Sequence, residues 1–261
     1  MNRLQGKLVL ITGASAGIGA ACAQAFAARG AHLLLSARRF SRLEALRDEL
    51  QDAHETEVHI EKLDIRDRGG VESYVAHLLS QGRVPDILVN NAGLSRGLEP
   101  FHQGQVEDWE EMIDTNVKGL LYMSRAVLPL MVERNSGHVI HIGSTAGDIV
   151  YPGGNVYNAT KFAVKALNQG MNLDVVGTRV RISSVDPGLV ETEFSQVRFH
   201  GDEERAAGVY RGYTPLTADD VADVVCYVAG APEHVNLMRT VVYPTDQRNP
   251  YVLHRETSTA G

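Results

Sequence analysis

Short apolar runs alternate along this chain with longer segments in which apolar residues recur at helical spacing. Several of the short runs are apolar at every position, as in Leu-Val-Leu-Ile at 8–11 and Ile-Leu-Val at 87–89. Such runs are typical of strands that helices bury on both faces. The pattern predicts seven strands, at residues 7–12, 32–36, 58–63, 86–90, 138–143, 180–185 and 239–243. A chain that alternates strand and helix in this way is expected to form a parallel, doubly wound α/β sheet with helices on both faces.

Polar residues and apolar spacing mark the expected helices. The Ser-Arg-Leu-Glu sequence at 41–44 has the form of a capping box and predicts a helix from there through Leu50. The Thr-Ala-Asp-Asp sequence at 217–220 resembles a weaker cap before a helix over 221–228. Two longer helices are expected around 108–132 and 157–176. The first carries apolar residues that could serve either a core or a contact between subunits: Trp109, Met112, Ile113 and Leu121.

The composition argues against several classes of protein. The 261 residues carry a formal net charge of −7 without a run of Lys or Arg, so nucleic acid is not expected as a partner. The apolar run at 8–11 is far too short to span a membrane, and the glycines after it favour a buried strand over a signal peptide. We therefore expect no membrane contact and a cytoplasmic location. No linker-like stretch divides the chain, so one domain is expected over 1–261, with a frayed end at 257–261.

Neither the cysteines nor the histidines are spaced as metal ligands, and no metal site is predicted. Cys22 and Cys226 each lie in an apolar, helix-like stretch, which predicts reduced thiols in the core. His102, His141 and His200 are far apart in the sequence and lack ligand spacing. We expect His141, on a predicted strand, to be a core residue and the other two to lie in loops.

The first predicted strand runs into a glycine-rich turn, Thr-Gly-Ala-Ser-Ala-Gly-Ile-Gly at 12–19, and then into an alanine-rich helix. Gly13, Gly17 and Gly19 would let the backbone turn tightly and let a pyrophosphate approach closely. The N-terminus of the helix would offer free N–H groups to the phosphates. A plain tight turn is the alternative, but the order strand, turn, helix favours a dinucleotide site.

These glycines resemble the cofactor motif of the short-chain dehydrogenase/reductase family. The Asn-Asn-Ala-Gly sequence at 90–93 resembles a second hallmark of that family, and the likeness extends over nearly the whole chain. The resemblance implies a Rossmann-type fold and a nicotinamide cofactor. The residues that it assigns to the cofactor are Gly13, Ser15, Gly17, Ile18, Gly19, Arg38, Arg39, Asp64, Ile65, Asn91, Ala92, Gly93, Tyr157, Lys161, Pro187, Gly188, Val190 and Thr192.

The residues after the second strand predict which nicotinamide is bound. In such folds an acid at this position binds the 2′-hydroxyl of NAD, whereas arginine accommodates the 2′-phosphate of NADP. Here Arg38 and Arg39 follow the strand with no acid at the junction, which predicts NADP. The alternative is that both arginines are solvated surface residues. By resemblance, Asp64 contacts the adenine and Asn91 packs beside the ribose.

Tyr157 and Lys161 lie one helical turn apart and form the Tyr-x-x-x-Lys pair of the same family. A free phenol has a pKa of about 10, and a nearby ammonium is expected to lower the pKa of Tyr157 so that it can exchange a proton with the substrate oxygen. The resemblance implies that Ser144 holds that oxygen, with Thr145 as the rival. It also implies that Asn116 anchors a water that links Lys161 to solvent; the alternative is a polar residue that only distorts its helix or lies at the surface.

Within the family, the stretches at 153–157, 190–195 and 197–199 resemble the NADP-dependent 3-hydroxy acid (serine) dehydrogenases, and 252–255 has the same character. This resemblance implies that the protein interconverts a small hydroxy acid, such as serine or 3-hydroxypropionate, and its semialdehyde. Two other readings stay open: an enzyme that acts on a ketone, sugar or sterol, and a regulator that binds NADP without chemistry. The family usually forms tetramers through its two long helices, so a homotetramer is expected.

A small anionic substrate needs a cation near the reacting carbon. Arg198, in a variable segment at about 189–215, is the candidate for a bidentate clamp, and Tyr151 and Asn155 are expected in the same pocket. An exposed arginine, or one paired with Glu193, is the alternative. A sulfonate would suit such a clamp as well as a carboxylate does, so reduction of sulfoacetaldehyde to isethionate also stays open.

Overall fold

The structure is a computed structural model that describes residues 2–256. Within them the chain forms one sheet from the strands β1 (Leu8–Thr12), β2 (His32–Ala37), β3 (Val58–Lys62), β4 (Ile87–Asn90), β5 (Gly137–Ile142), β6 (Val180–Pro187) and β7 (Arg239–Val242). All pairings within the sheet are parallel, and the strand order is β3-β2-β1-β4-β5-β6-β7. The predicted strands and the doubly wound fold are confirmed, with bounds that differ by one or two residues.

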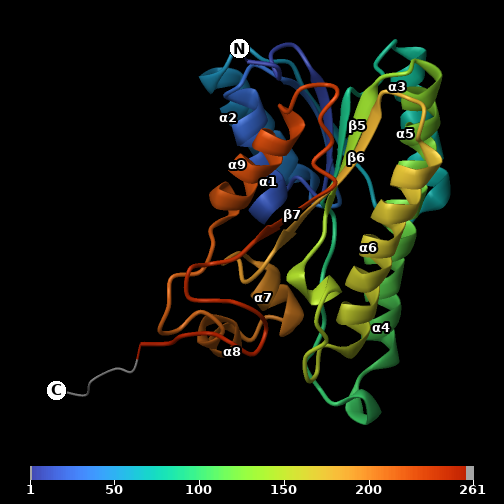
Figure 1. Cartoon of the computed structure of the whole chain (residues 1–261). Coiled ribbons are helices and arrows are strands. Elements are labelled where there is room, and N and C mark those ends of the chain that lie inside the picture. The colour runs from blue at the N-terminus through green and yellow to red at the C-terminus, as the bar shows by residue number, and fades with distance from the viewer. Residues whose placement is uncertain (1, 257–261) are drawn as a thin grey trace.

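Helices cover both faces of the sheet (Figure 1). One face packs against α1 (Gly17–Ala27), α2 (Phe40–Ala53) and α9 (Ala218–Ala229), and the other against α3 (Arg68–Ser80), α5 (Leu120–Glu133) and α6 (Asn155–Asp174). Successive strand residues point to opposite faces, so Val9 and Ile11 join the first cluster while Leu10 joins the second. Strands that are apolar at every position are therefore needed to fill both layers.

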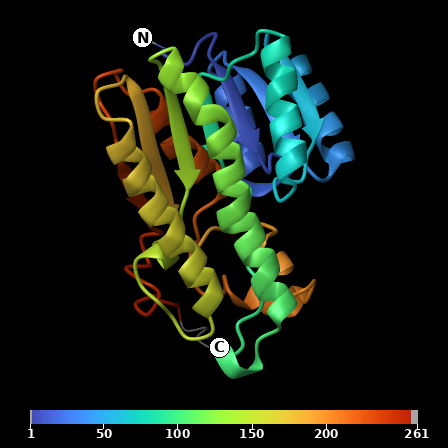
Figure 2. The ribbon, with the colours of Figure 1, turned by 90° about the vertical axis from the view of Figure 1, so that its right-hand side faces the viewer.

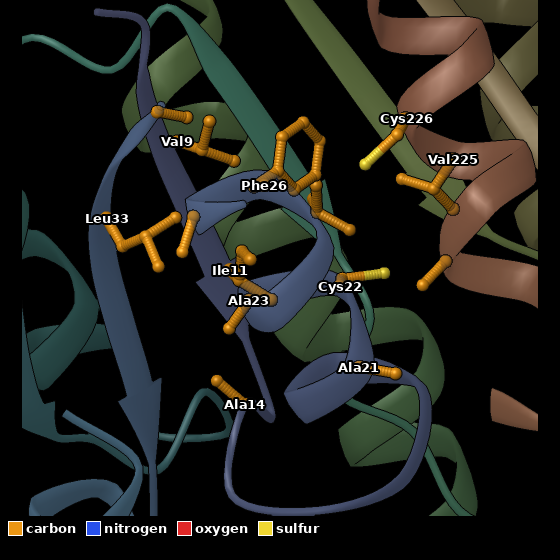
Figure 3. Close-up of a cluster of buried hydrophobic side chains, with 14 of the residues drawn as sticks. Val9, Ile11, Ala14, Ala21, Cys22, Ala23, Phe26, Leu33, Val225 and Cys226 are labelled. Carbon is orange, nitrogen blue, oxygen red and sulfur yellow. The ribbon is translucent and has the colours of Figure 1, made fainter. Parts of the chain in front are cut away.

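The cluster between the sheet and α1 and α9 holds both cysteines (Figure 3). Phe26 of α1 is fully buried there, and removing such a side chain from water stabilises the fold by about 2–3 kcal/mol. Cys22 of α1 and Cys226 of α9 are free thiols in this layer, as predicted. Burial raises the pKa of both, and therefore leaves them protonated and unreactive.

The predicted helix starts are right at α9 and wrong at α2. Thr217 and Asp220 form a complete capping box at the start of α9. Ser41, by contrast, is not a cap, because α2 begins at Phe40 and runs on to Ala53. The earlier start lets the ring of Phe40 pack against the first apolar cluster, and Ser41 then lies inside the helix.

The first of the two long helices is composite. It consists of α4 (Val106–Ile113), a π-helical segment η2 (Asp114–Gly119) and α5, which follow one another without a break. Figure 2 shows this helix and α6 side by side along the molecule. In it, Met112 is buried while Ile113 and Leu121 stay exposed, so its apolar residues serve both a core and an outer face. No helix among the described residues has the length and apolar character needed to cross a membrane.

The histidines lie close to where the sequence placed them. His141 on β5 is fully buried, with its Nδ1 3.3 Å from Nδ2 of Asn90, and His138 on the same strand is also buried. His200 lies after the short helix α7 (Phe194–Arg198) and contacts Asp108, whereas His102 lies in a 3-10 turn, η1 (Phe101–Gln103). The residues described include no group of His, Cys, Asp or Glu that could hold a metal ion.

Candidate active site

A cavity of about 550 Å³ lies at the carboxyl ends of the strands, where the strand order reverses between β1 and β4. Ligands bind at this switch point in doubly wound sheets. The walls come from the turn after β1, the ends of β2 and β3, and the segments after β4, β5 and β6. The short helices α7 and α8 (Glu203–Gly208) lie below these strand ends (Figure 1).

The glycine turn after β1 has the geometry that a phosphate site requires. Gly13 and Gly17 have φ of +66° and +54°, which favours glycine. A Cβ on Gly13 would lie 2.8 Å from the Cα of Ala92, and one on Gly19 would lie 2.5 Å from the carbonyl oxygen of Gly13. The first two glycines line the cavity together with Ser15 and Ile18, whereas Gly19 packs beneath the turn. No side chain caps α1, so the N–H groups of its first turn are available to an anion.

Thr12 and Asn91 fix this turn to the end of β4. The side chain of Asn91 donates to the carbonyl oxygens of Thr12 and Gly13 at 2.9 and 3.3 Å. In return, the Thr12 hydroxyl accepts from the backbone N–H groups of Asn91 and Ala92, both at 3.1 Å. The Asn-Asn-Ala-Gly sequence thus holds the turn in shape. Its residues 91–93 also line the cavity, and the contact of Asn91 with a ribose stays a prediction.

The predicted adenosine end is rich in charge, and every residue assigned to it lines the cavity: Arg38, Arg39, Asp64 and Ile65. Arg39 donates to the carboxylate of Glu193 at 2.8 Å and to the hydroxyl of Ser15 at 3.1 Å. Arg38 lies 3.7 Å from Glu111. Arg66 binds Asp64 at 2.6 Å and, by hydrogen bonding to it, lowers the pKa of that carboxyl. The arginines are therefore ion-paired, which the sequence did not predict.

Tyr157 lies in the first turn of α6 with its ring 8% exposed. The ring is flanked by Phe194, at 5.7 Å between centroids, and by the guanidinium carbon of Arg198, at 5.2 Å from the Tyr157 centroid. Lys161 Nζ lies 5.8 Å from the same centroid and donates to the carbonyl oxygen of Ile142 at 3.0 Å. The structure thus brings the predicted tyrosine and lysine together in the cavity.

The pKa of Tyr157 differs from the expectation. Burial raises it above the usual value, and this effect outweighs the opposing effects of Arg198 and of a hydrogen bond with Ser144. Burial also lowers the pKa of Lys161 to about 8, against the charge of Asp186. The prediction that Lys161 lowers the pKa of Tyr157 is therefore wrong for this structure, in which the cation that lowers it is Arg198.

Ser144, at the end of β5, has its hydroxyl at the bend into η3 (Thr145–Gly147). It accepts from the N–H of Ala146 at 3.1 Å and lies 3.5 Å from the carbonyl oxygen of Pro187. Both Ser144 and its rival Thr145 line the cavity, but of the two only Ser144 acts on the pKa of Tyr157, which it lowers. This effect favours Ser144 as the group that meets the substrate oxygen.

Asn116 is buried within the π-helical segment η2 and does not line the cavity. Its amide oxygen accepts from the N–H of Leu94 at 2.9 Å, and its amide nitrogen donates to the carbonyl oxygen of Leu94 at 2.8 Å and to the hydroxyl of Thr160 at 3.1 Å. The side chain therefore ties η2 to the segment after β4 and to α6. The water link to Lys161 stays a prediction, and it would need a backbone group of Asn116.

Arg198, on α7, points into the same cavity. Its Nε donates to the hydroxyl of Ser95 and its Nη2 to the hydroxyl of Tyr151, each at 2.9 Å. Glu193 binds Arg39 and Arg42 instead, so the alternative salt bridge to Arg198 does not form. Among residues 2–256, no carboxylate pairs with Arg198. Its charge is available to a ligand.

The prediction that Asn155 lies in the substrate pocket is wrong. Its amide nitrogen donates to the carbonyl oxygen of Glu99 at 3.3 Å, and its amide oxygen accepts from the N–H of Val156 at 2.6 Å. It does not line the cavity, because the oxygen and the nitrogen of its amide both form hydrogen bonds with backbone groups near the start of α6. The cofactor residues assigned at the end of β6 and after it do line the cavity, namely Pro187, Gly188, Val190 and Thr192.

Sequence reasoning missed several wall residues, among them Leu98, Phe194, Val197, Tyr210, Gln247 and Pro250. Gln247 is buried and accepts from the N–H of Leu189 at 2.9 Å, which brings the segment after β7 back to the cavity. Residues 257–261, expected to fray, lie outside the described part of the chain. The spacing of residues in the sequence gave no signal for the missed wall residues, because their contacts join irregular segments of the chain.

The chain is similar to known oxidoreductases. A family model described as short chain dehydrogenase matches residues 7–203. The NADP-dependent 3-hydroxy acid dehydrogenase YdfG of Salmonella typhi is 50% identical over 241 residues, which are 92% of this chain and 96% of that protein. Sulfoacetaldehyde reductase 2 of Chromohalobacter salexigens is 43% identical over 241 residues, 92% of this chain and 95% of that protein.

The chain is also similar in structure to solved dehydrogenases. The closed form of serine dehydrogenase complexed with NADP+ has a TM-score of 0.89 and 47% identity, and the match covers 95% of this chain and 100% of that one. Serine dehydrogenase from Escherichia coli has a TM-score of 0.78 and 44% identity, with 92% of this chain and 99% of that one covered.

Proposed function

The chain belongs to the short-chain dehydrogenase/reductase family and is an NADP-dependent oxidoreductase, and we propose that it interconverts a small 3-hydroxy acid and its semialdehyde. The observation that carries the choice of substrate is Arg198, whose guanidinium faces the cavity 5.2 Å from the ring centroid of Tyr157. An acid group bound by this guanidinium would hold its own hydroxyl carbon close to the phenol.

Residues suited to each part of the cofactor line the cavity. The N–H groups at the start of α1 would hold the pyrophosphate, and a Cβ at Gly13 would clash with Ala92 and displace the turn. We propose that Arg38 and Arg39 hold the 2′-phosphate. Pro187, whose carbonyl oxygen lies 3.5 Å from the Ser144 hydroxyl, and Gly188 line the cavity and would contact the nicotinamide, whereas Thr192 lies next to Gly17 in the turn. When bound, the cofactor accepts or supplies a hydride at its nicotinamide ring.

The protein's own groups handle the proton and the orientation. Ser144 would hold the substrate oxygen, and Tyr157 would take the hydroxyl proton during oxidation or return it during reduction. Because burial disfavours the phenolate, nearby positive charge is needed to make it accessible. Arg198 supplies part of that charge.

One further substrate is favoured by the same observation. A sulfonate presents three oxygens to a guanidinium as a carboxylate presents two, so Arg198 would also bind sulfoacetaldehyde or isethionate. The similarity to sulfoacetaldehyde reductase 2 supports this second candidate. A regulator without chemistry is disfavoured, because Ser144, Tyr157 and Lys161 meet in one cavity.

A panel of matched substrates tests the proposal. Oxidation of 3-hydroxypropionate, serine, isethionate and the neutral 1,3-propanediol is followed by NADPH absorbance, with NADP+ and NAD+ side by side. We expect kcat/KM for the anions to exceed that for the diol at least about tenfold, from the charged hydrogen bonds to Arg198. Equal rates with the diol, or turnover confined to ketones, sugars or sterols, would contradict the proposal.

We also propose that the protein assembles as a homotetramer in the cytoplasm. The composite helix α4–η2–α5 and α6 lie side by side (Figure 2) and expose Ile113, Leu121 and Phe162, which are 41%, 36% and 38% exposed. Apolar residues on an outer helix pair support burial against another copy. Light scattering of the purified protein measures the state directly.

A further inference from the structure

Glu193 occupies the basic end of the cavity. Its two carboxylate oxygens bind two different arginines, Arg39 at 2.8 Å and Arg42 at 2.7 Å. These arginines follow β2, whereas Glu193 follows β6, more than 150 positions later in the sequence. The pair of contacts thus joins the segment after β6 to the start of α2.

This carboxylate lies where a second anion is expected. Glu193, Arg39 and Ser15 all line the cavity, and Arg39 also donates to the Ser15 hydroxyl in the phosphate-binding turn. An anion seated beside the adenosine ribose would need the same guanidinium that Glu193 now holds. Two anions share the charge and donors of one guanidinium only at reduced strength, so the two contacts compete.

The segment that carries Glu193 also carries the substrate end of the site. Glu193 is the residue before α7, and Phe194 and Arg198 of that helix flank the ring of Tyr157. The ion pairs at Glu193 therefore anchor α7 to the cofactor end of the cavity. Whatever replaces them changes the anchoring of the groups that touch Tyr157.

We propose that Glu193 is an internal competitor of the cofactor's 2′-phosphate: its carboxylate takes Arg39 and Arg42 in the free protein, and the 2′-phosphate displaces it and releases the anchor of α7. A phosphate monoester carries nearly two negative charges, whereas a carboxylate carries one, so the arginines bind the phosphate more strongly. Displacing Glu193 nevertheless reduces the net affinity for the cofactor. A nucleotide without a 2′-phosphate has no need to displace Glu193. The inference rests on the proposed seat of the 2′-phosphate at Arg39.

Calorimetric titration with 2′,5′-ADP and with 5′-ADP tests the competition without turnover. Glu193→Gln is expected to tighten 2′,5′-ADP roughly three- to tenfold, which corresponds to the loss of two half-exposed ion pairs, and to change 5′-ADP by less than about twofold. Glu191→Gln is the matched control, because it removes the same charge from the same segment at an exposed residue that does not line the cavity. It should leave both constants unchanged.

Two outcomes are distinguishable. If Arg39→Gln fails to weaken 2′,5′-ADP, the proposed phosphate seat is wrong, and the competition falls with it. If Arg39→Gln weakens 2′,5′-ADP while Glu193→Gln leaves it unchanged or weakens it, the seat stands and the competition is refuted.

Hydrogen exchange of the backbone amides measures whether the ion pairs of Glu193 hold α7 in place. Addition of 2′,5′-ADP should speed the exchange of backbone amides in α7 of the wild-type protein, and 5′-ADP should not. Glu193→Gln should show the faster exchange before any ligand is added. Exchange in α7 that is the same with and without Glu193 would overturn the release step.

Discussion

Replacing Arg198 by methionine separates two effects of one guanidinium. Methionine keeps much of the apolar contact with the rings of Tyr157 and Phe194 but removes the charge. The variant loses the clamp for an acid group. It also loses the cation that lowers the pKa of Tyr157 in the free protein. The first loss acts on anionic substrates only, and the second acts on every substrate.

The structure sets the size of both effects. The guanidinium carbon lies 5.2 Å from the ring centroid of Tyr157, and at that distance and an effective dielectric constant of about 20 two unit charges attract by roughly 3 kcal/mol. Arg198 is only partly buried, so solvent screening reduces this attraction, and loss of the guanidinium raises the pKa of Tyr157. Losing charge-assisted hydrogen bonds to an acid group costs about 1.5–3 kcal/mol, which is roughly a 10- to 150-fold loss in kcat/KM.

The assay is alcohol oxidation with saturating NADP+ over a range of pH. Oxidation needs the phenolate, so activity rises as the pH passes through the pKa of Tyr157. Without Arg198 that pKa is higher, and the rise in activity should move to higher pH for anionic and neutral substrates alike. Arg198→Lys is the control, because it keeps the charge and should hold the pH midpoint while it weakens bidentate binding.

Two results would refute this reasoning. One is an Arg198→Met enzyme whose loss is the same for 3-hydroxypropionate and for 1,3-propanediol, since the guanidinium would then not bind the acid group. The other is a pH midpoint that does not move, which would mean that Arg198 does not control the ionisation of Tyr157.

Three further predictions follow from the geometry of the site and of the outer helices. Tyr157→Phe should abolish turnover while calorimetry shows nearly unchanged NADP+ binding; residual turnover above about 1% would contradict the proton role. Gly19→Ala places a methyl 2.5 Å from the Gly13 carbonyl oxygen, so it should weaken NADP+ binding and cost about 1–3 kcal/mol of unfolding free energy in a urea titration; an unchanged midpoint would be evidence against the tight packing. Phe162→Glu, at a 38% exposed position on α6, should shift light scattering toward smaller species while the circular dichroism spectrum is retained; an intact tetramer would exclude this face as the interface.

The strands and the cofactor turn could be predicted because their requirements are local. A run such as Leu-Val-Leu-Ile suits a strand between two helical layers and few other environments. The turn requires positive φ at Gly13 and Gly17, and glycine is the residue that adopts such a backbone conformation most readily. The order of the motifs along the chain then placed Ser144, Tyr157 and Lys161 at neighbouring strand and helix ends.

The features that could not be predicted from the sequence depend on the tertiary surroundings of polar groups. Asn155 was expected in the pocket, but an amide at a helix start can equally bind backbone groups, and the structure takes that option. The pairing of Glu193 with Arg39 and Arg42 joins segments that only the sheet topology brings together. The pKa of Tyr157 depends on how deeply the ring is buried, which no spacing rule contains.

The two imidazoles inside β5 set a lower limit to the pH that the fold can tolerate. Burial lowers the pKa of His141 to about 4 and that of His138 well below its usual range, whereas both would titrate near 6.5 in the unfolded chain. Their neutral forms therefore support the folded state fully above about pH 6.5, and proton uptake by the unfolded chain removes that support as the pH falls. For His141 alone the loss reaches about 3 kcal/mol near pH 4. Inactivation of this enzyme by acid should accordingly follow unfolding of the chain around β5, at a pH below that at which Lys161 takes up its proton.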